Sequence, residues 1–390
     1  MKNKDFINIE THYSLSQPNQ SDSVFHKGEG VWLWDIESLQ YLDLTTMQNH
    51  AIFGHSPSRL VKVLVEQAQN LSLNTNFVYT DRLGPFLKKL SEMTLFARCM
   101  AFSSTYQAYS EMIFYSMNAI SRLKNLATDE LKVVFLSSRH KDSHPYVDLF
   151  HGCSFLSLNE IDELEKVESQ LSLVILDLLD LNQPNLLLTH DTVFKIKQIT
   201  KRSQAFLVAD ESHIPPGSLG INFAFQAYDP QLFDGFILGE YLGGGLTPMC
   251  AGGVTENVFQ QAGTLHSSMS SLYPLGPAVG LESLCMLEEM FLAEKALVKG
   301  AIIQNYFAQR KFIKEVYSHG LIFKIILSDE CDINTIAAQL KDQLLLCHIF
   351  NDKMLMITPA LIISEQEIEI LLQKLGNIFP LEVVKELSSS

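Results

Sequence analysis

The sequence predicts an α/β protein with a mostly parallel sheet, helices on both faces of that sheet, and a second, smaller core. Its 390 residues exceed the ~100–200 residues of a usual single core, and 47% of them are hydrophobic, which suffices for two packed cores. Between about residues 95 and 285, short apolar runs alternate with helical patterns, which is typical of a parallel sheet. The predicted strands are 133–136, 173–176, 206–209, 236–238 and 252–254, with helical patterns such as 189–200 between them.

Net charge, cysteine content and apolar runs indicate which partners and which cellular compartment to expect. A formal charge of −15 argues against nucleic acid and anionic membranes as partners. The six cysteines are scattered without a Cys-x-x-Cys pair, which is typical of reduced thiols rather than of a disulfide framework or a zinc site. The first residues lack the apolar core of a signal peptide, and no apolar run reaches the ~18–20 residues of a membrane span. We therefore expect a soluble cytoplasmic protein.

The remaining elements follow in chain order. Residues 28–43 predict two short strands around a turn, and residues 58–71 predict an amphipathic helix. From about residue 288 we expect one long helix, strands at 322–326, 344–348 and 354–358, and two further helices. Ser364 and Glu367 form a capping box before the last of them. The expected domains are an N-terminal segment (1–50) that joins a C-terminal α+β domain (288–390), and a large α/β domain (51–287).

Two stretches organise the chain. Phe206-Leu-Val-Ala-Asp-Glu-Ser-His213 is an apolar run that ends in carboxylates, and Asp234-Gly-Phe-Ile-Leu-Gly-Glu-Tyr-Leu-Gly-Gly-Gly245 ends in a carboxylate and a glycine triplet. The carboxyl ends of parallel strands are where open α/β sheets place their ligands. The two stretches resemble those of the class III aminotransferases of the ornithine and acetylornithine type, which read Asp-Glu-Val-Gln and Gly-Lys-x-Leu-Gly-Gly-Gly.

The resemblance runs from about residue 28 to about residue 374. It implies the fold-type I scaffold, a seven-stranded sheet in the large domain, pyridoxal phosphate as cofactor, and a homodimer whose interface includes residues 74–80. In that family the lysine of the second stretch forms the Schiff base with the cofactor, and here its position holds Glu240. Between Arg202 and Lys295 there is no lysine or arginine at all, so this half of the sheet supplies no amine.

Other positions of the resembled site differ as well. Asp210 matches the aspartate that pairs with the ring nitrogen, although an aspartate that only caps a turn would give the same sequence pattern. His213 replaces the glutamine that follows that aspartate. The phosphate-binding Ser-Gly-Thr-Glu-Ala aligns with Ser104-Thr-Tyr-Gln-Ala108, in which Thr105 carries a Cβ that glycine lacks.

Three further positions belong to the resembled site. The aromatic residue that stacks on the cofactor ring aligns with Arg139, directly before His140. A phosphate-gripping threonine aligns with Met269, beside Ser268, and the arginine that clamps the substrate carboxylate aligns with Met356. The candidate cofactor contacts are therefore Asp210, Ser104, Thr105, His140 and Ser268, and the candidate catalytic residues are Glu240, Asp210 and His213.

Two other patterns favour structure over chemistry. His140, His144 and His151, with Asp142, have spacings that suggest a metal, but Pro145 interrupts any helix through them, and loop histidines are the preferred interpretation. The glycine triplet is interpreted as a turn rather than an anion cradle. We expect no metal.

Our first hypothesis is a degenerate aminotransferase that cannot form an internal aldimine and serves as a homodimer in binding, assembly or regulation, with an unknown small molecule or protein as partner. The second is an enzyme of altered chemistry, either with acid–base groups Glu240, Asp210 and His213 or with pyridoxamine phosphate held non-covalently. The third is an ordinary class III aminotransferase, in which Glu240 does not correspond to the lysine or in which the lysine has been replaced by mutation.

Overall fold

The chain folds into two compact units. The computed structural model describes residues 1–15, 22–74, 78–144, 146–150, 152–263, 273–307, 310–350 and 353–381. The large unit is Ser58–Ala296, and the small unit combines Met1–Pro57 with Leu297–Ser390.

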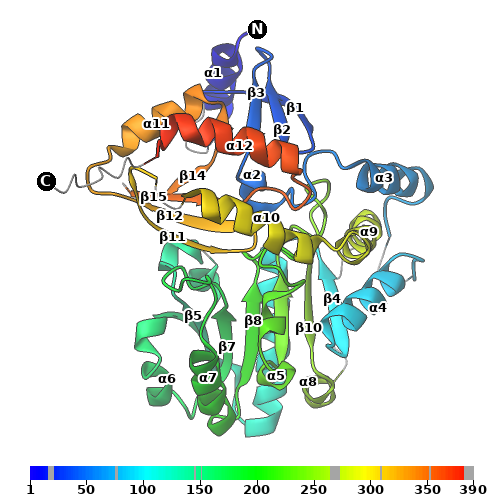
Figure 1. Ribbon diagram of the computed structural model, residues 1–390. Coiled ribbons are helices and arrows are strands. Elements are labelled where there is room, and N and C mark those ends of the chain that lie inside the picture. Colours follow the sequence, from blue (N-terminus) through cyan, green and yellow to red (C-terminus); the bar gives the residue numbers. More distant parts are fainter. Residues whose placement is uncertain are drawn as a thin grey trace, which may run out of the picture. The chain divides into compact units, whose positions relative to one another are not determined.

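The large unit is built on a seven-stranded sheet in the order β4-β10-β9-β8-β7-β5-β6 (Figure 1). Strands β9, β8, β7, β5 and β6 run parallel, whereas β10 is antiparallel to both of its neighbours. The mostly parallel sheet predicted from the sequence is therefore confirmed. The strands are β4 (Arg98–Phe102), β5 (Lys132–Ser137), β6 (Cys153–Ser157), β7 (Leu171–Asp177), β8 (Phe206–Glu211), β9 (Gly235–Leu238) and β10 (Cys250–Val254).

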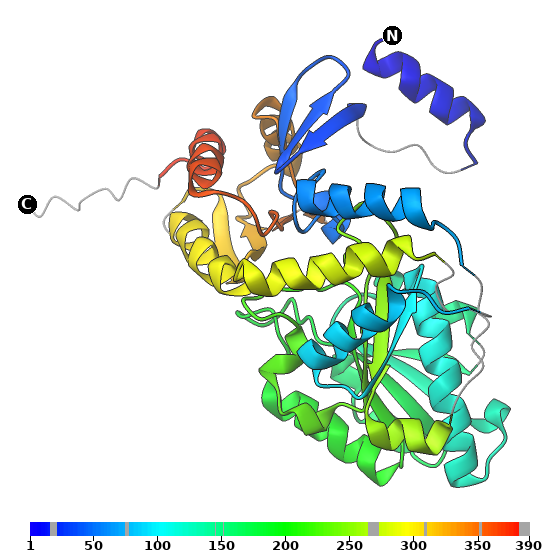
Figure 2. The same ribbon diagram turned by 90° about the vertical axis from the view of Figure 1, so that its right-hand side faces the viewer.

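Helices cover both faces of this sheet. Figure 2 shows α5 (Thr105–Lys124) and α7 (His190–Arg202) on opposite sides of the strands. Both helices begin at side-chain caps, since Ser104 accepts from the Gln107 N–H and Thr189 accepts from the Thr192 N–H. The other helices are α3 (Ser58–Asn70), α4 (Leu83–Thr94), α6 (Glu163–Lys166), α8 (Glu256–Ala262), α9 (Leu275–Glu289) and α10 (Leu292–Phe307), the last of which crosses the boundary of the two units.

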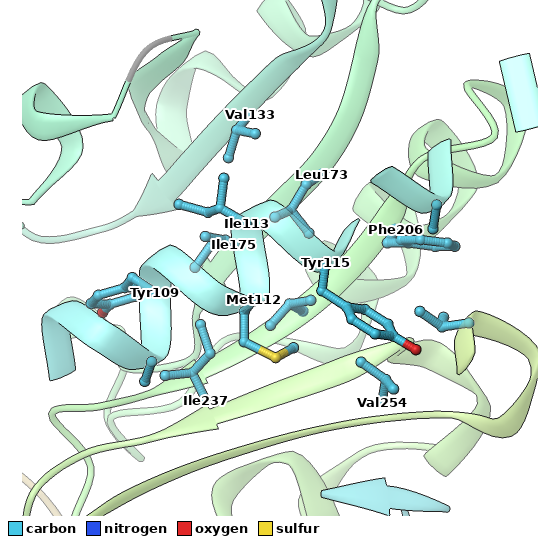
Figure 3. Close-up of a cluster of buried hydrophobic side chains, with 14 of the residues drawn as sticks. Tyr109, Met112, Ile113, Tyr115, Val133, Leu173, Ile175, Phe206, Ile237 and Val254 are labelled. Atoms are coloured by element: carbon cyan, nitrogen blue, oxygen red, sulfur yellow. The ribbon is translucent and has the colours of Figure 1, made fainter. Parts of the chain in front are cut away.

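A core of apolar side chains packs α5 against the sheet. In Figure 3, Met112 and Ile113 of the helix lie among side chains from the strands. Alternate residues of each strand face the helix, as the two-residue period of a strand requires. Burial of each large apolar side chain contributes about 1.5–3 kcal/mol. The strand residues in this core include Val133, Phe135, Leu173, Ile175, Phe206, Val208 and Ile237.

The small unit contains two four-stranded sheets, β1-β2-β3-β13 and β11-β12-β15-β14. Their strands are β1 (Phe25–Glu29), β2 (Trp32–Asp35), β3 (Gln40–Asp43), β11 (Ile313–His319), β12 (Ile322–Leu327), β13 (Leu345–Leu346), β14 (His348–Phe350) and β15 (Met354–Ile357). Its helices are α1 (Asn3–Tyr13), α2 (Thr46–Asn49), α11 (Ile333–Asp342) and α12 (Glu365–Ile378). The predicted capping box is confirmed, because Ser364 and Glu367 exchange hydrogen bonds at the start of α12.

Short 3-10 turns complete the chain. They are Thr128–Glu130, Lys141–Ser143, Val147–Leu149, Leu158–Glu160, Ala224–Ala227 and Pro230–Leu232. Among the helices of the described residues, none combines the length and the apolar character that a membrane span needs.

The long helix expected from about residue 288 is α10, which begins at Leu292. The preceding helix, α9, ends at Glu289. Between them, Phe291 has a positive φ of 51°, a left-handed conformation that a continuous α-helix does not accommodate.

Candidate functional site

Polar side chains gather at the carboxyl ends of the parallel strands of the large sheet. Asp177 ends β7, Asp210 lies next to the end of β8, and Arg139 and Glu240 follow β5 and β9 by two residues. These four strands are parallel and lie side by side, so their carboxyl ends meet at the same edge. The predicted residues Asp210 and Glu240 are therefore brought to one region of the large unit.

Asp210 is bound by a side chain that the sequence did not single out. It is 2% exposed, and its Oδ2 accepts a 2.7 Å hydrogen bond from the hydroxyl of Tyr109 in α5. Its Oδ1 accepts a 2.9 Å bond from the Ser212 N–H, which is the turn-capping role weighed above. Burial, and next the Asp210 carboxylate, raise the pKa of Tyr109 well above its ordinary value. Tyr109 is thus a protonated donor to an acceptor carboxylate.

Glu240 lies at the first turn of α5. Its Oε1 accepts from the Thr105 N–H at 3.2 Å and lies 3.4 Å from the Thr105 hydroxyl. Ser104, directly before, uses its own hydroxyl to cap the Gln107 N–H at 3.2 Å. The predicted residues Glu240, Thr105 and Ser104 therefore share the N-terminus of one helix. A carboxylate there is stabilised by the unpaired N–H groups and by the positive end of the helix dipole.

Glycine at 239 allows the two strand ends to approach each other. A Cβ at Gly239 would lie 2.2 Å from the carbonyl oxygen of Ser212, a contact that no side chain tolerates. The glycine triplet that follows forms a hydrogen-bonded turn, with the Gly244 N–H donating to the Tyr241 carbonyl at 2.9 Å, as its sequence predicted. Close backbone packing thus sets the position of Glu240.

Arg139 forms a buried ion pair with Asp177. Its Nε donates to Oδ2 of Asp177 at 2.6 Å, and the two side chains are 12% and 2% exposed. Ser137 donates to the same oxygen at 2.7 Å, and His144 lies 3.6 Å from it. Burial alone would raise the pKa of Asp177, but the charge of Arg139 and the contact with His144 outweigh it and hold that pKa well below its ordinary value.

Glu211 is the second carboxylate at the end of β8, and it is fully buried. It accepts hydrogen bonds from the backbone N–H groups of Ala224 at 2.8 Å and Phe225 at 2.6 Å. Burial raises the pKa of Glu211 to about 8 despite those bonds. Its partners are backbone groups of the 3-10 turn Ala224–Ala227, which indicates a structural role.

The predicted histidines occupy different environments. His213 is exposed, and its ring lies edge-to-face against that of the buried His144, with centroids 6.0 Å apart. Protein atoms crowded round the ring, and next the charge of Arg139, lower the pKa of His213 although the ring keeps access to solvent. His140 is 80% exposed and pairs with Asp142 within its own turn. Among the described residues, no three potential ligands are placed to share a metal ion.

Three positions of the resembled site, Ser268, Met269 and Met356, are not among the side chains described above. Ser268 and its neighbour Met269 lie outside the described residues. Met356 lies in β15 of the small unit, where it is opposite Lys324 of β12.

Two residues of this site, Asp177 and Tyr109, were not predicted from the sequence. Asp177 follows a predicted apolar strand, as Asp210 does. This shared pattern would have placed Asp177 at the carboxyl ends of the strands. Tyr109 follows Thr105 by four residues, which puts both on one face of the helix.

Comparison with known proteins gives the same fold. Ornithine aminotransferase from Staphylococcus carnosus (strain TM300) is 25% identical over 97% of this chain and 99% of its own. The enzyme of that name from Bacillus subtilis (strain 168) is 23% identical over 97% of this chain and 98% of its own. In structure, ornithine aminotransferase from Toxoplasma gondii ME49 matches with a TM-score of 0.85 at 20% identity, over 97% of this chain and 94% of that one.

A second structure supports the same assignment of fold. Acetylornithine aminotransferase from Elizabethkingia anophelis matches with a TM-score of 0.84 at 21% identity, over 97% of this chain and 98% of that one. The predicted fold-type I scaffold is therefore confirmed. The model of the family "Aminotransferase class-III" matches residues 146–379, more than half of the 390 residues. The chain belongs to the class III aminotransferase family.

Proposed function

We propose that this family member is a degenerate aminotransferase, which keeps the scaffold but forms no Schiff base with pyridoxal phosphate. The observation that carries the proposal is Glu240, which stands where the resembled Gly-Lys-x-Leu-Gly-Gly-Gly has its lysine. A Schiff base needs a neutral amine as nucleophile, and a carboxylate offers none. The sequence from 203 to 294 contains no lysine from which a neighbouring strand end could supply one.

The position of the Glu240 carboxylate also opposes the cofactor's phosphate. In the resembled family the phosphate binds at the start of the helix that corresponds to α5. Here Oε1 of Glu240 accepts from the Thr105 N–H at that same helix start. Two unit negative charges 4 Å apart repel by about 4 kcal/mol at an intermediate dielectric constant. The residues present therefore do not fit pyridoxal phosphate held as in the family, and the same charge opposes pyridoxamine phosphate.

The alternative of altered acid–base chemistry receives less support. Asp210 is buried and accepts from Tyr109 and Ser212, and Glu240 faces Thr105. Of the three candidate catalytic residues, His213 is the exposed one. Acid–base catalysis needs groups that reach a substrate proton. Equal activity of Glu240→Gln and wild type, in any reaction found for this protein, would remove Glu240 from such a role.

We propose a homodimer that acts in binding, assembly or regulation. Of the segment that resembles the family's dimer interface, residues 74–80, residues 75–77 lie outside the described part, and the residues described after them include exposed apolar side chains. Val78 is 59% exposed and Tyr79 is 105% exposed, and Leu73 just before the segment is 56% exposed. Exposed apolar side chains so near one another in the chain favour a partner surface. Light scattering after gel filtration tests this: we expect twice the chain mass for wild type and a shift toward the monomer for Tyr79→Asp.

The absorption spectrum tests the loss of Schiff-base chemistry. We expect the purified protein to be colourless in the visible range, both alone and after incubation with pyridoxal phosphate and removal of the excess. Ornithine aminotransferase from Bacillus subtilis, treated in parallel, is the positive control. A yellow protein that bleaches on addition of borohydride would contradict the proposal.

A further inference from the structure

We propose that Glu240 is an internal anion that occupies the N-terminus of α5 in place of an external one, so that this helix start is complete without any ligand. The inference rests on the proposed function and deepens it. Loss of the lysine prevents only the covalent bond to the cofactor. If Glu240 is an internal anion, it also fills the position in which the phosphate would bind non-covalently, and the stability of the fold depends on it.

Three backbone N–H groups at the start of α5 and just before it donate to the chain's own atoms. The Ser103 N–H donates to the side-chain oxygen of Gln107 at 2.9 Å, and the Gln107 N–H donates to the Ser104 hydroxyl at 3.2 Å. The Thr105 N–H donates to Glu240 at 3.2 Å. A phosphate bound at a helix start uses such N–H groups. Three of them here already have internal acceptors, and one of those acceptors carries a negative charge.

The charge of Glu240 suits this place. The N-terminus of a helix carries a partial positive charge that favours an anion within the first turn. No residue from 203 to 294 brings a lysine or arginine to compensate Glu240. In the described part of the chain, the Glu240 carboxylate has its hydrogen bonds with Thr105 at the helix start, so the carboxylate and the helix stabilise each other.

A second contact, between Tyr109 and Asp210, independently supports the inference that the chain replaces the cofactor's contacts with its own. In the resembled family, the aspartate at position 210 pairs with the ring nitrogen of the cofactor. Here the Tyr109 hydroxyl donates to Asp210 at 2.7 Å, from one helical turn beyond Thr105. The same face of α5 thus brings a backbone donor to Glu240 and a side-chain donor to Asp210. Two separate contacts of the resembled site are made within the chain.

The test is rescue of a truncated side chain by free anions. Glu240→Ala removes the carboxylate and leaves room for a small anion, whereas Glu240→Gln keeps the shape and removes the charge. Thermal unfolding is measured for both variants and wild type in sodium chloride, sodium acetate and sodium phosphate at matched ionic strength. Glu256→Ala is the control, because Glu256 also lies at a helix N-terminus, as the first residue of α8, but is 46% exposed and pairs with Arg98.

We expect the unfolding midpoints of both Glu240 variants to lie about 2–4 °C or more below that of wild type. A shift of this size corresponds to a small loss of unfolding free energy in a large domain. Acetate and phosphate should raise the midpoint of Glu240→Ala relative to chloride, because they bind the folded state. The midpoint of Glu240→Gln should show no such gain. Any general effect of the salts is measured by wild type and Glu256→Ala, and is subtracted.

Two results would overturn the inference. One is an unfolding midpoint of Glu240→Ala equal to that of wild type. The other is a gain from acetate and phosphate in Glu240→Ala that does not exceed the gain in wild type, because the anions would then fill no position that the carboxylate had occupied. Either result leaves the proposed function standing if wild type still forms no Schiff base. A coloured wild-type protein would instead remove the proposed function itself.

Discussion

The hydroxyl of Tyr109 lies 2.7 Å from Oδ2 of Asp210 and also 2.7 Å from Oγ of Ser212. This short contact joins α5 to the end of β8 at a carboxylate that is 2% exposed. A buried carboxylate requires hydrogen bonds to compensate for the water it has lost. Tyr109 supplies one from within the chain, and the stability of the large unit should depend on it.

Tyr109→Phe should therefore destabilise the protein. The change removes one donor and leaves an acceptor of Asp210 unsatisfied, which costs about 1–3 kcal/mol in unfolding free energy. Urea unfolding followed by circular dichroism measures it. Tyr115→Phe is the matched control, because Tyr115 is also a buried tyrosine of α5 but donates through a longer, 3.5 Å bond to the Gly263 carbonyl. Equal losses for the two variants would contradict a special role of the Asp210 contact.

Arg139 should be more important to stability than an exposed arginine. Arg139→Met leaves Asp177 buried without its charged partner, for which a loss of about 3–5 kcal/mol is typical. The comparison is Arg202→Met, since Arg202 pairs with Glu165 at 2.7 Å but both side chains are 52% exposed. Surface pairs contribute about 0–1 kcal/mol. Similar unfolding free energies for the two variants would show that the Arg139–Asp177 pair does not stabilise the fold.

Glu211 should make stability fall as the pH rises. Burial raises its pKa to about 8 in the folded chain, above the ordinary ~4.3 of an unfolded glutamate. Between these values the folded state holds a proton that the unfolded state lacks, so unfolding free energy decreases by at most about 1.4 kcal/mol per pH unit. This contribution is fully present below the unfolded pKa and is lost as the pH passes the folded one.

The variant Glu211→Gln tests the sign. It resembles the protonated side chain and cannot ionise, so its unfolding free energy should decline less between pH 5 and pH 8 than that of wild type. Urea unfolding at several pH values measures the slope, with Glu256→Gln as the exposed control. If wild type and Glu211→Gln have the same slope over this window, Glu211 is ionised in the folded state throughout.

Restoring the lysine should not restore the cofactor. Glu240→Lys provides an amine, but it places a positive charge at the positive end of α5, where the Thr105 N–H also loses its acceptor. Asp210 also keeps Tyr109 as its partner. We expect no visible absorption with pyridoxal phosphate and a lower unfolding temperature than wild type. A yellow variant that transaminates ornithine would show that the lysine alone had been missing.

The sequence predicts the interior of the sheet better than its edges. The five strands predicted in the large unit are β5, β7, β8, β9 and β10, all flanked by neighbours on both sides. The strands that were missed are all at an edge: β4 and β6 in the large sheet, and β1 and β11 in the two sheets of the small unit. An edge strand has water on one side, so its residues do not form a continuous apolar run.

The site was predictable at its strand ends but not in its contacts. Asp210 and Glu240 stand out because each follows an apolar run. The bond from Tyr109 to Asp210 joins residues 101 positions apart and depends on how α5 packs against the sheet. The contact of Thr105 with Glu240 spans 135 positions for the same reason. Local patterns in a sequence contain no information about such pairs.

The most direct measurement is the intact mass of wild type after incubation with one equivalent of pyridoxal phosphate and reduction with borohydride. Borohydride fixes any Schiff base, and peptide mapping then locates it. The account predicts no stoichiometric adduct, with only trace labelling that is spread over lysines as in the unfolded chain. One equivalent of cofactor on a single lysine of the folded protein would contradict it.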